Sequence, residues 1–244
     1  MSIPTPDHQR LIRKLKSIYR LDREDEMALG ELPLRHKAVE ENADVVREGD
    51  APNECCLLLE GILCRYKIVG DGRRQILSFH IGGDVPDLQS LHLDVMDHSV
   101  GALTPCRLAF IPHEAMAALL RERPNLAAAF WRDTLIDAAV FREWLAGVGR
   151  RNSHQRVAHL YCEVFSRLEA VGLASNLNFP FPVTQAEIAD ALGLTPVHVN
   201  RVLQDLRRDG LIASDGRSLR ILDWGRLTSA GDFDATYLHL RQAA

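Results

Sequence analysis

The sequence lacks several features that would assign a function at once. No apolar run approaches the roughly 20 residues of a membrane-spanning helix, and residues 1–10 are polar, with no apolar signal-peptide stretch after them. No P-loop, H-E-x-x-H motif or nucleophile–base pairing is visible. The net charge of −4 does not point to nucleic acid, so any such function must rest on local clusters. We therefore expect a cytoplasmic protein that is not an enzyme and has no membrane partner.

Cysteine is scarce and shows no metal-binding spacing. The five cysteines are an odd number and include no C-x-x-C pair. Neighbours such as Cys55 and Cys56 point to opposite faces of a strand, which is a poor geometry for one metal ion. In a reducing compartment such residues are typically buried thiols. We interpret all five as structural thiols, with a redox or metal role as the alternative; they are Cys55, Cys56, Cys64, Cys106 and Cys162.

The first half of the chain changes from helical to β patterning. The whole chain has 244 residues, 46% of them hydrophobic, which is enough for one large domain or two smaller ones. Residues 9–29 show the apolar spacing of one amphipathic helix. From Val39 to about Pro112, short apolar runs are separated by glycines, as at Gly70 and Gly72. This spacing predicts an antiparallel β sandwich or barrel.

A long helix is predicted after the β segment. Residues 113–121 favour a short helix, and Pro124 suits the first turn of the next, which continues to about residue 149. At about 37 Å, this helix either spans its own domain or packs against a second copy. Its apolar stripe consists of Leu126, Phe130, Thr134, Ala138, Phe141, Leu145 and Val148.

Three further boundaries are predicted beyond this helix. Gly147 and Gly149, followed by a polar run, indicate a hinge. Ser153 is the expected cap of a helix over about 154–171. The Asn- and Pro-rich residues 176–182 read as a linker.

The stretch TQAEIADALGLTPVHVNRVLQDLRRDGLI has the pattern of a helix-turn-helix. Thr184 and Glu187 form a capping box that starts a helix. Gly193 supplies the positive φ of a tight turn between helices. Thr195 can cap the second helix, with Pro196 in its first turn. The apolar residues of the small core between the helices are Ile188, Leu192, Leu194, Val199 and Val202.

The second of these helices is the predicted recognition helix. If its apolar residues face inward, its polar residues face outward, where Arg can pair with guanine and Asn or Gln can read adenine. A solvated helix surface is the alternative. The predicted DNA-binding residues on this helix are Thr195, Pro196, Val197, Asn200, Arg201, Gln204 and Arg208.

A hairpin with its turn at Asp215-Gly216 is predicted after the recognition helix. Arg217 and Arg220 on this hairpin are expected to reach phosphates, as a wing would. Further local positive charge is expected from Arg150, Arg151, His154 and Arg156.

With these parts in this order, the chain resembles the Crp/Fnr family over nearly its whole length. The resemblance rests on REGDAPNECCLLLEGILCRYK, the long helix and the helix-turn-helix. It implies an α+β fold: an antiparallel, jelly-roll-like β-roll as sensor (1–123), a dimerisation helix (124–150) and a winged helix-turn-helix (151–244). It also implies a homodimer that binds palindromic promoter sites in double-stranded DNA and recruits RNA polymerase, usually as an activator. The expected dimer contacts are Phe130, Phe141 and Leu145.

The stretch IGGDVPDLQSLHLDVMDHSV departs from the cAMP-binding members of that family. Those members carry a Gly-Glu pair whose Glu meets the ribose 2′-OH, and an Arg-Ser pair whose Arg neutralises the cyclic phosphate. Here Gly83 and Ser99 are in place, but Asp84 replaces the Glu and His98 the Arg. A histidine is mostly neutral near pH 7 and lacks the guanidinium fork. These four residues are effector-pocket candidates, but we do not expect cAMP. The oxygen-sensing members of that family carry an N-terminal cysteine cluster for an iron–sulfur centre. No cysteine precedes Cys55 here, so that cofactor is not expected either, and the effector is left unassigned.

Two alternatives remain open. The group His92, Asp94, Asp97 and His98 has metal-binding residue types, but its spacing matches no established metal signature, and an exposed polar loop is favoured. The helix-turn-helix of a ligand sensor can also contact protein instead of DNA; salt-dependent binding to duplex DNA separates these functions.

Overall fold

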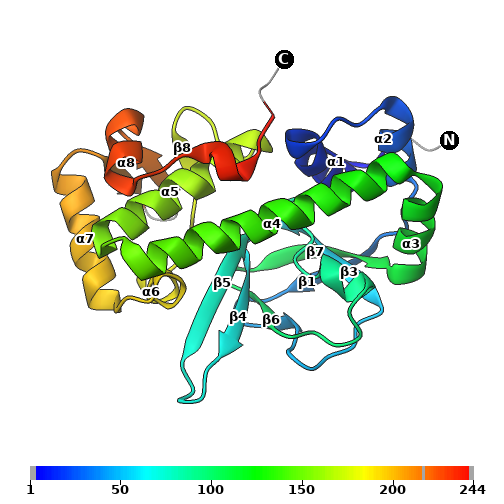
Figure 1. Cartoon of the computed structure of the whole chain (residues 1–244), viewed down its shortest axis with the longest axis horizontal. Helices are drawn as coiled ribbons and strands as arrows, with labels where there is room; N and C mark the ends of the chain where they lie inside the picture. Colours follow the sequence, from blue (N-terminus) through cyan, green and yellow to red (C-terminus); the bar gives the residue numbers. More distant parts are fainter. Residues whose placement is uncertain (1–3, 216–217, 242–244) are drawn as a thin grey trace. The chain divides into compact units, whose positions relative to one another are not determined.

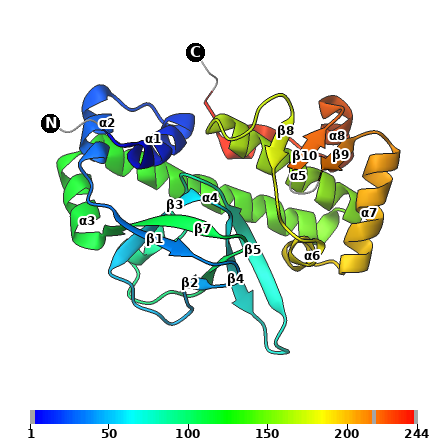
Figure 2. The ribbon, with the colours of Figure 1, turned by 180° about the vertical axis from the view of Figure 1, so that it is seen from behind.

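The computed structural model describes residues 4–215 and 218–241. It divides into two compact units: the first contains most of the chain up to Leu135, and the second contains Arg73–Ile76 and Ile136–Leu240. The boundary between them falls inside one continuous helix, α4 (Pro124–Arg150). Figures 1 and 2 show the elements from two sides.

The first unit begins with two helices where the sequence pattern predicted one. Helix α1 covers Pro6–Ile18 and α2 covers Arg23–Gly30. The chain is extended at Tyr19, and the Asp22 side chain caps α2 by accepting a hydrogen bond from the Asp25 amide. The prediction of a single helix over 9–29 was therefore wrong, because a local cap at Asp22 starts a second helix.

Seven antiparallel strands follow, as the glycine-punctuated pattern predicted: β1 (Arg35–Val39), β2 (Asp44–Val46), β3 (Glu54–Glu60), β4 (Leu63–Ile68), β5 (Arg74–His80), β6 (Ser99–Ala102) and β7 (Cys106–Pro112). They form one sheet in the order β1-β7-β3 and another in the order β2-β6-β4-β5 (Figures 1 and 2). The short 3₁₀ helix η1 (Leu88–Leu91) lies between β5 and β6.

Strand β3 explains why its sequence is apolar without alternation. Cys56 and Leu58 belong to the core that both sheets share, whereas Cys55, Leu57 and Leu59 face the opposite way. This second face packs against α1, α2, α3 (His113–Glu122) and the start of α4. Because side chains alternate along a strand and both faces are covered, every position of the run is buried.

The second unit is built around α5 (Ser153–Ala170), which packs against α6 (Gln185–Leu192), α7 (Pro196–Arg208) and α8 (Trp224–Gly231). Strands β8 (Asn178–Pro180), β10 (Ser218–Ile221) and β9 (Ile212–Asp215) form its antiparallel sheet in that order. The predicted linker 176–182 thus contains a strand, because its Phe179 is buried and pairs with Leu219. The 3₁₀ helix η2 (Ala235–Leu238) follows α8.

Two predicted boundaries around α5 were wrong. Asn152 caps α5 by accepting from the Gln155 amide, so the cap lies one residue before Ser153. Helix α4 runs through both glycines of the predicted hinge to Arg150. The Arg156 guanidinium donates to the carbonyl oxygens of Val148 and Arg151, which satisfies C-terminal carbonyls of α4 that would otherwise lack partners.

Candidate nucleic-acid interface

Helices α6 and α7 form the predicted helix-turn-helix. The Thr184 hydroxyl accepts from the Glu187 amide at 3.2 Å, and the Glu187 carboxylate accepts from the Thr184 amide at 2.7 Å. Gly193 ends α6 in the left-handed region, with φ of 63°. Thr195 caps α7, and Pro196 is its first residue. These features confirm the capping and turn residues read from the sequence.

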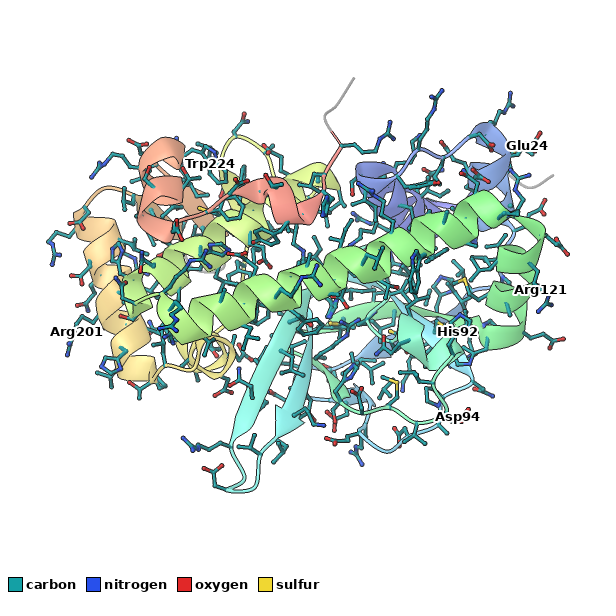
Figure 3. All side chains as sticks on the ribbon, viewed as in Figure 1. Glu24, His92, Asp94, Arg121, Arg201 and Trp224 are labelled. Carbon is teal, nitrogen blue, oxygen red and sulfur yellow. The ribbon has the colours of Figure 1, made fainter. Side chains whose placement is uncertain are left out.

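Helix α7 has one buried and one exposed face. Val199 and Val202, which were predicted to face inward, are at most 5% exposed, and Leu206 is fully buried beside them on the same helix face. Val197 is 69% exposed, an unusual position for a large apolar side chain. Arg201 is exposed and projects outward from α7 (Figure 3). The exposed face thus combines a cation with an apolar group, both of which can contact base edges.

The polar residues of α7 differ in the hydrogen bonds and ion pairs that they make within the chain. Arg208 pairs with Asp205 at 2.8 Å, so its charge is partly offset within the helix. Asn200 is half-buried and donates to Gln185 of α6, while Gln204 donates to Asn200. These contacts, of which the Asn200–Gln185 bond joins the two helices, were not foreseen, because the sequence pattern treats each outward position as free.

The hairpin after α7 is formed by β9 and β10, as predicted. Arg220 on β10 is exposed. Arg217, and with it the turn residue Gly216, lies outside the described residues. Arg207, which was not predicted as a functional residue, is exposed at the end of α7 and donates to the Ser214 hydroxyl on β9 at 2.9 Å, which ties the helix to the hairpin.

Two of the four basic residues predicted as extra positive charge are engaged in the fold. Arg151 pairs with Glu143 at 2.6 Å and with Asp232 at 3.2 Å. Arg156 donates to three backbone carbonyls, including that of Leu192 at the end of α6. The charge of Arg151 is therefore offset by two carboxylates, whereas Arg156 is bound to neutral carbonyl groups and retains its positive charge, and Arg150 is exposed.

The effector-pocket candidates Gly83 and Asp84 are covered by α1. A side chain at Gly83 would meet the Arg10 carbonyl oxygen at 2.8 Å, and its φ is +103°. Asp84 is 3% exposed and accepts from the Lys14 ammonium at 2.7 Å. Lys14 also contacts Asp133 of α4, at 3.2 Å. The Asp84 carboxylate is therefore paired with the Lys14 ammonium group within the chain.

The other two candidates lie in β6 and the loop before it. His98 is 8% exposed, with Nδ1 2.6 Å from Asp97 and Nε2 3.0 Å from the Gln89 amide nitrogen. The Ser99 hydroxyl accepts from the Glu48 amide at 3.0 Å. The structure therefore places all four candidates in the β-roll, each with an intramolecular role. At the two positions where cAMP-binding members carry Glu and Arg, Asp84 is a carboxylate paired with Lys14, and His98 contacts Asp97 and lacks a guanidinium fork, so these two residues do not fit a cyclic phosphate.

A buried carboxylate next to this region was missed by the sequence analysis. Asp87 is fully buried; its Oδ1 accepts from the Cys56 amide at 2.7 Å, and within the described residues its Oδ2 has no hydrogen-bond partner. Burial raises the pKa of Asp87 to about 6. No local sequence signal could have found it, because its burial depends on strand β3, about thirty residues away.

The cysteines and the loop acids form no metal site in the described part of the chain, where no group of three or more His, Cys, Asp or Glu side chains is arranged to hold an ion. His92 and Asp94 lie on the loop after η1 (Figure 3). All five cysteines are buried free thiols. Burial raises the pKa of both Cys55 and Cys162 to about 12, so neither is a thiolate near neutral pH.

Helix α4 carries exposed apolar residues along its length. Trp131 is 65% exposed, Leu135 50%, Leu145 74% and Val148 41%. Phe141 is half-buried. Phe130, predicted at the dimer interface, is 3% exposed and packs inside the first unit. Phe130 is therefore unavailable to a second chain in this conformation, and its prediction as a dimer contact is corrected. The reason is that it lies one helical turn after Leu126, on the face of α4 that packs into the core.

Two domain models match the chain: a cyclic nucleotide-binding domain over residues 36–123 and a Crp-like helix-turn-helix domain over residues 155–230. No helix among the described residues is long and apolar enough to cross a membrane.

Similar proteins cover most of the chain. The nitrogen fixation regulation protein FixK of Bradyrhizobium diazoefficiens is 32% identical over 75% of this chain and 76% of its own length. The transcriptional activator protein FnrL of Cereibacter sphaeroides is 27% identical over 83% and 92%. The structure of FixK2 from Bradyrhizobium japonicum shares the fold, with a TM-score of 0.74, 23% identity and coverage of 82% and 98%. The chain belongs to the Crp/Fnr family of DNA-binding transcription regulators.

Proposed function

We propose that this regulator is a cytoplasmic homodimer that inserts α7 into the major groove of inverted-repeat promoter sites. The observation that carries the proposal is the two-faced α7: its apolar residues are buried, while Val197 and Arg201 are exposed side by side, one helical turn apart. Arg201 is suited to bidentate contact with guanine O6 and N7. Thr195 and Pro196 at the start of α7, with Gln204, Arg208, Arg220 and Arg217 farther along, are the proposed flanking contacts.

The exposed stripe of α4 is the proposed dimer interface. Trp131, Leu135, Leu145 and Val148 leave apolar surface in water, and two copies of the helix packed together would bury it. Phe141 lies between them in the sequence and is half-buried in its own chain. A symmetric dimer would hold its two recognition helices about 34 Å apart, one turn of DNA, which accounts for an inverted-repeat site.

Activation through RNA polymerase is the proposed outcome of binding. Relatives such as FnrL, and Anr of Pseudomonas aeruginosa, are named transcriptional activators. Neither cAMP nor an iron–sulfur cluster is proposed as the effector. The signal sensed by the β-roll is left open, since Asp84 and His98 are each engaged within the chain.

Binding-site selection from random-sequence duplex pools, followed by fluorescence anisotropy on the selected site, tests the proposal. We expect selection of an inverted repeat with its half-site centres about 10 base pairs apart, and an affinity that falls steeply as salt rises because phosphate contacts release counterions. Selection of single, unpaired half-sites would contradict the dimer model. Salt-independent binding, or none, would contradict DNA binding by α7. Micromolar cAMP affinity in calorimetry, with tighter DNA binding, would contradict the effector proposal.

A further inference from the structure

Asn200 on α7 is the middle member of a chain of three amide side chains. Its Nδ2 donates to Oε1 of Gln185, the first residue of α6, at 3.1 Å. Its Oδ1 accepts from Nε2 of Gln204, one turn farther along α7, at 3.0 Å. Gln185 and Asn200 are half-buried, whereas Gln204 is exposed. The chain therefore links the two helices of the motif next to Arg201.

These two bonds leave Asn200 with a defined capacity. An asparagine amide has two donor hydrogens and two acceptor lone pairs. Gln185 and Gln204 use one of each, so one hydrogen and one lone pair remain. Reversing all three amides leaves the same remainder, so the count does not depend on which amide atom is nitrogen. One donor beside one acceptor is what adenine N7 and N6 require in the major groove.

We propose that Gln185 and Gln204 are positioning residues that hold Asn200 so that it reads one adenine per half-site, beside the guanine of Arg201. This rests on the proposed placement of α7 in the groove. An unheld asparagine can rotate and also donate to guanine or accept from cytosine, because its amide carries both kinds of group. The amide chain restricts that rotation, so its contribution is to discrimination between bases more than to affinity.

The test compares binding to the selected site with binding to the same site altered at single base pairs. Gln185→Leu keeps the side-chain size and removes the acceptor. We expect it to reduce the preference for adenine at the Asn200 pair about three- to tenfold, the range of one hydrogen bond, with the Arg201 guanine unaffected. Gln204→Leu should act at the same pair, and Asn200→Ala should abolish the preference there.

Gln185→Glu is the conservative control, because its carboxylate still accepts from Asn200. It should retain the adenine preference even though its charge lowers the affinity for all sequences alike. Gln9→Leu on α1 is the matched control elsewhere in the chain and should change nothing. Thermal unfolding of each variant checks that the domain remains folded.

Three results would overturn the inference. One is equal weakening of all sequences by Gln185→Leu, which would make Gln185 a phosphate contact. Another is an unchanged preference in both leucine variants. The third is a selected site without adenine at a pair that responds to Asn200→Ala. A wild-type protein without any salt-dependent binding would instead overturn the proposed function itself, so the two failures are distinguishable.

Discussion

The indole Nε1 of Trp144 donates a hydrogen bond to the Glu163 carboxylate across 2.9 Å. Trp144 lies on α4 and Glu163 on α5, and the glutamate is fully buried. The same carboxylate oxygen accepts from the Tyr237 hydroxyl at 2.8 Å, and that hydroxyl lies 3.0 Å from His159. The C-terminal half of α4 is thus fixed to the DNA-binding domain by a buried polar network.

Removing the centre of this network should destabilise the second unit. Glu163→Ala leaves the Trp144 indole N–H and the Tyr237 hydroxyl without their acceptor, which we expect to cost about 2–4 kcal/mol. Glu163→Gln retains an acceptor and should cost less. Urea unfolding followed by tryptophan fluorescence measures both. Glu169→Ala, at an exposed position on the same helix, is the matched control, and an equal loss there would contradict the assignment.

The buried Asp87 should make stability depend on pH. Its pKa is raised from 3.8 to about 6 by burial, so the folded protein holds its proton more tightly than the unfolded chain does. The contribution of Asp87 is therefore most favourable below about pH 4 and is lost as pH rises toward 6. Between pH 4.5 and 7.5 this loss amounts to roughly 2 kcal/mol.

Asp87→Asn should remove that loss, so the variant gains stability relative to the wild type as pH rises. Paired denaturant titrations at the two pH values measure the difference. Asp50→Asn, at an exposed position on the loop before β3, is the control. A constant difference between Asp87→Asn and wild type at both pH values would show that the carboxyl does not titrate there.

The thiols should be unreactive in the folded protein. All five are buried, and burial raises the pKa of Cys55 and Cys162 to about 12. At pH 7.5 a thiol reagent should therefore label no cysteine in native protein and five in urea, as counted by intact mass. Rapid labelling of one thiol under native conditions would revive a redox role.

Local signals made the helix-turn-helix predictable. Thr184, Gly193, Thr195 and Pro196 each set a cap or a turn through contacts within a few residues, so the sequence carried their roles in full. The β pattern was equally clear, since both faces of β3 are covered.

Long-range partners were not predictable in this way. The Lys14–Asp84 pair joins residues 70 positions apart, and Arg156 reaches Leu192 across 36. The Lys14–Asp84 pair engages a predicted effector residue. Arg156 also donates to the Val148 carbonyl oxygen near the end of α4, where a hinge was predicted. Neither contact has a signature in residue spacing, because each depends on how separate elements pack.

Charge placed on the exposed stripe of α4 should separate the proposed dimer. Leu145→Glu puts like charges on both sides of a two-fold interface. We expect the dissociation constant of the dimer to rise roughly tenfold or more, with loss of operator binding. Trp131→Glu should act alike. Sedimentation measures the monomer fraction. Arg121→Glu on α3, also exposed (Figure 3), is the control. An unchanged dimer in both variants would place the interface elsewhere.

Base reading by α7 gives the sharpest test. In familiar branches of the family, a Glu one turn before the Arg that matches Arg201 accepts a hydrogen bond from cytosine. Here that position is Val197, which is 69% exposed and unable to accept one. The site should therefore keep the guanine read by Arg201 and show no strong demand at the Val197 pair. Arg201→Ala should cost about 1–3 kcal/mol and relax one position. Val197→Glu should create a demand for cytosine, because a carboxylate buried without a donor is costly. Binding-site selection with wild type and both variants measures this. Unchanged base preferences in both would mean that α7 does not enter the major groove in this orientation.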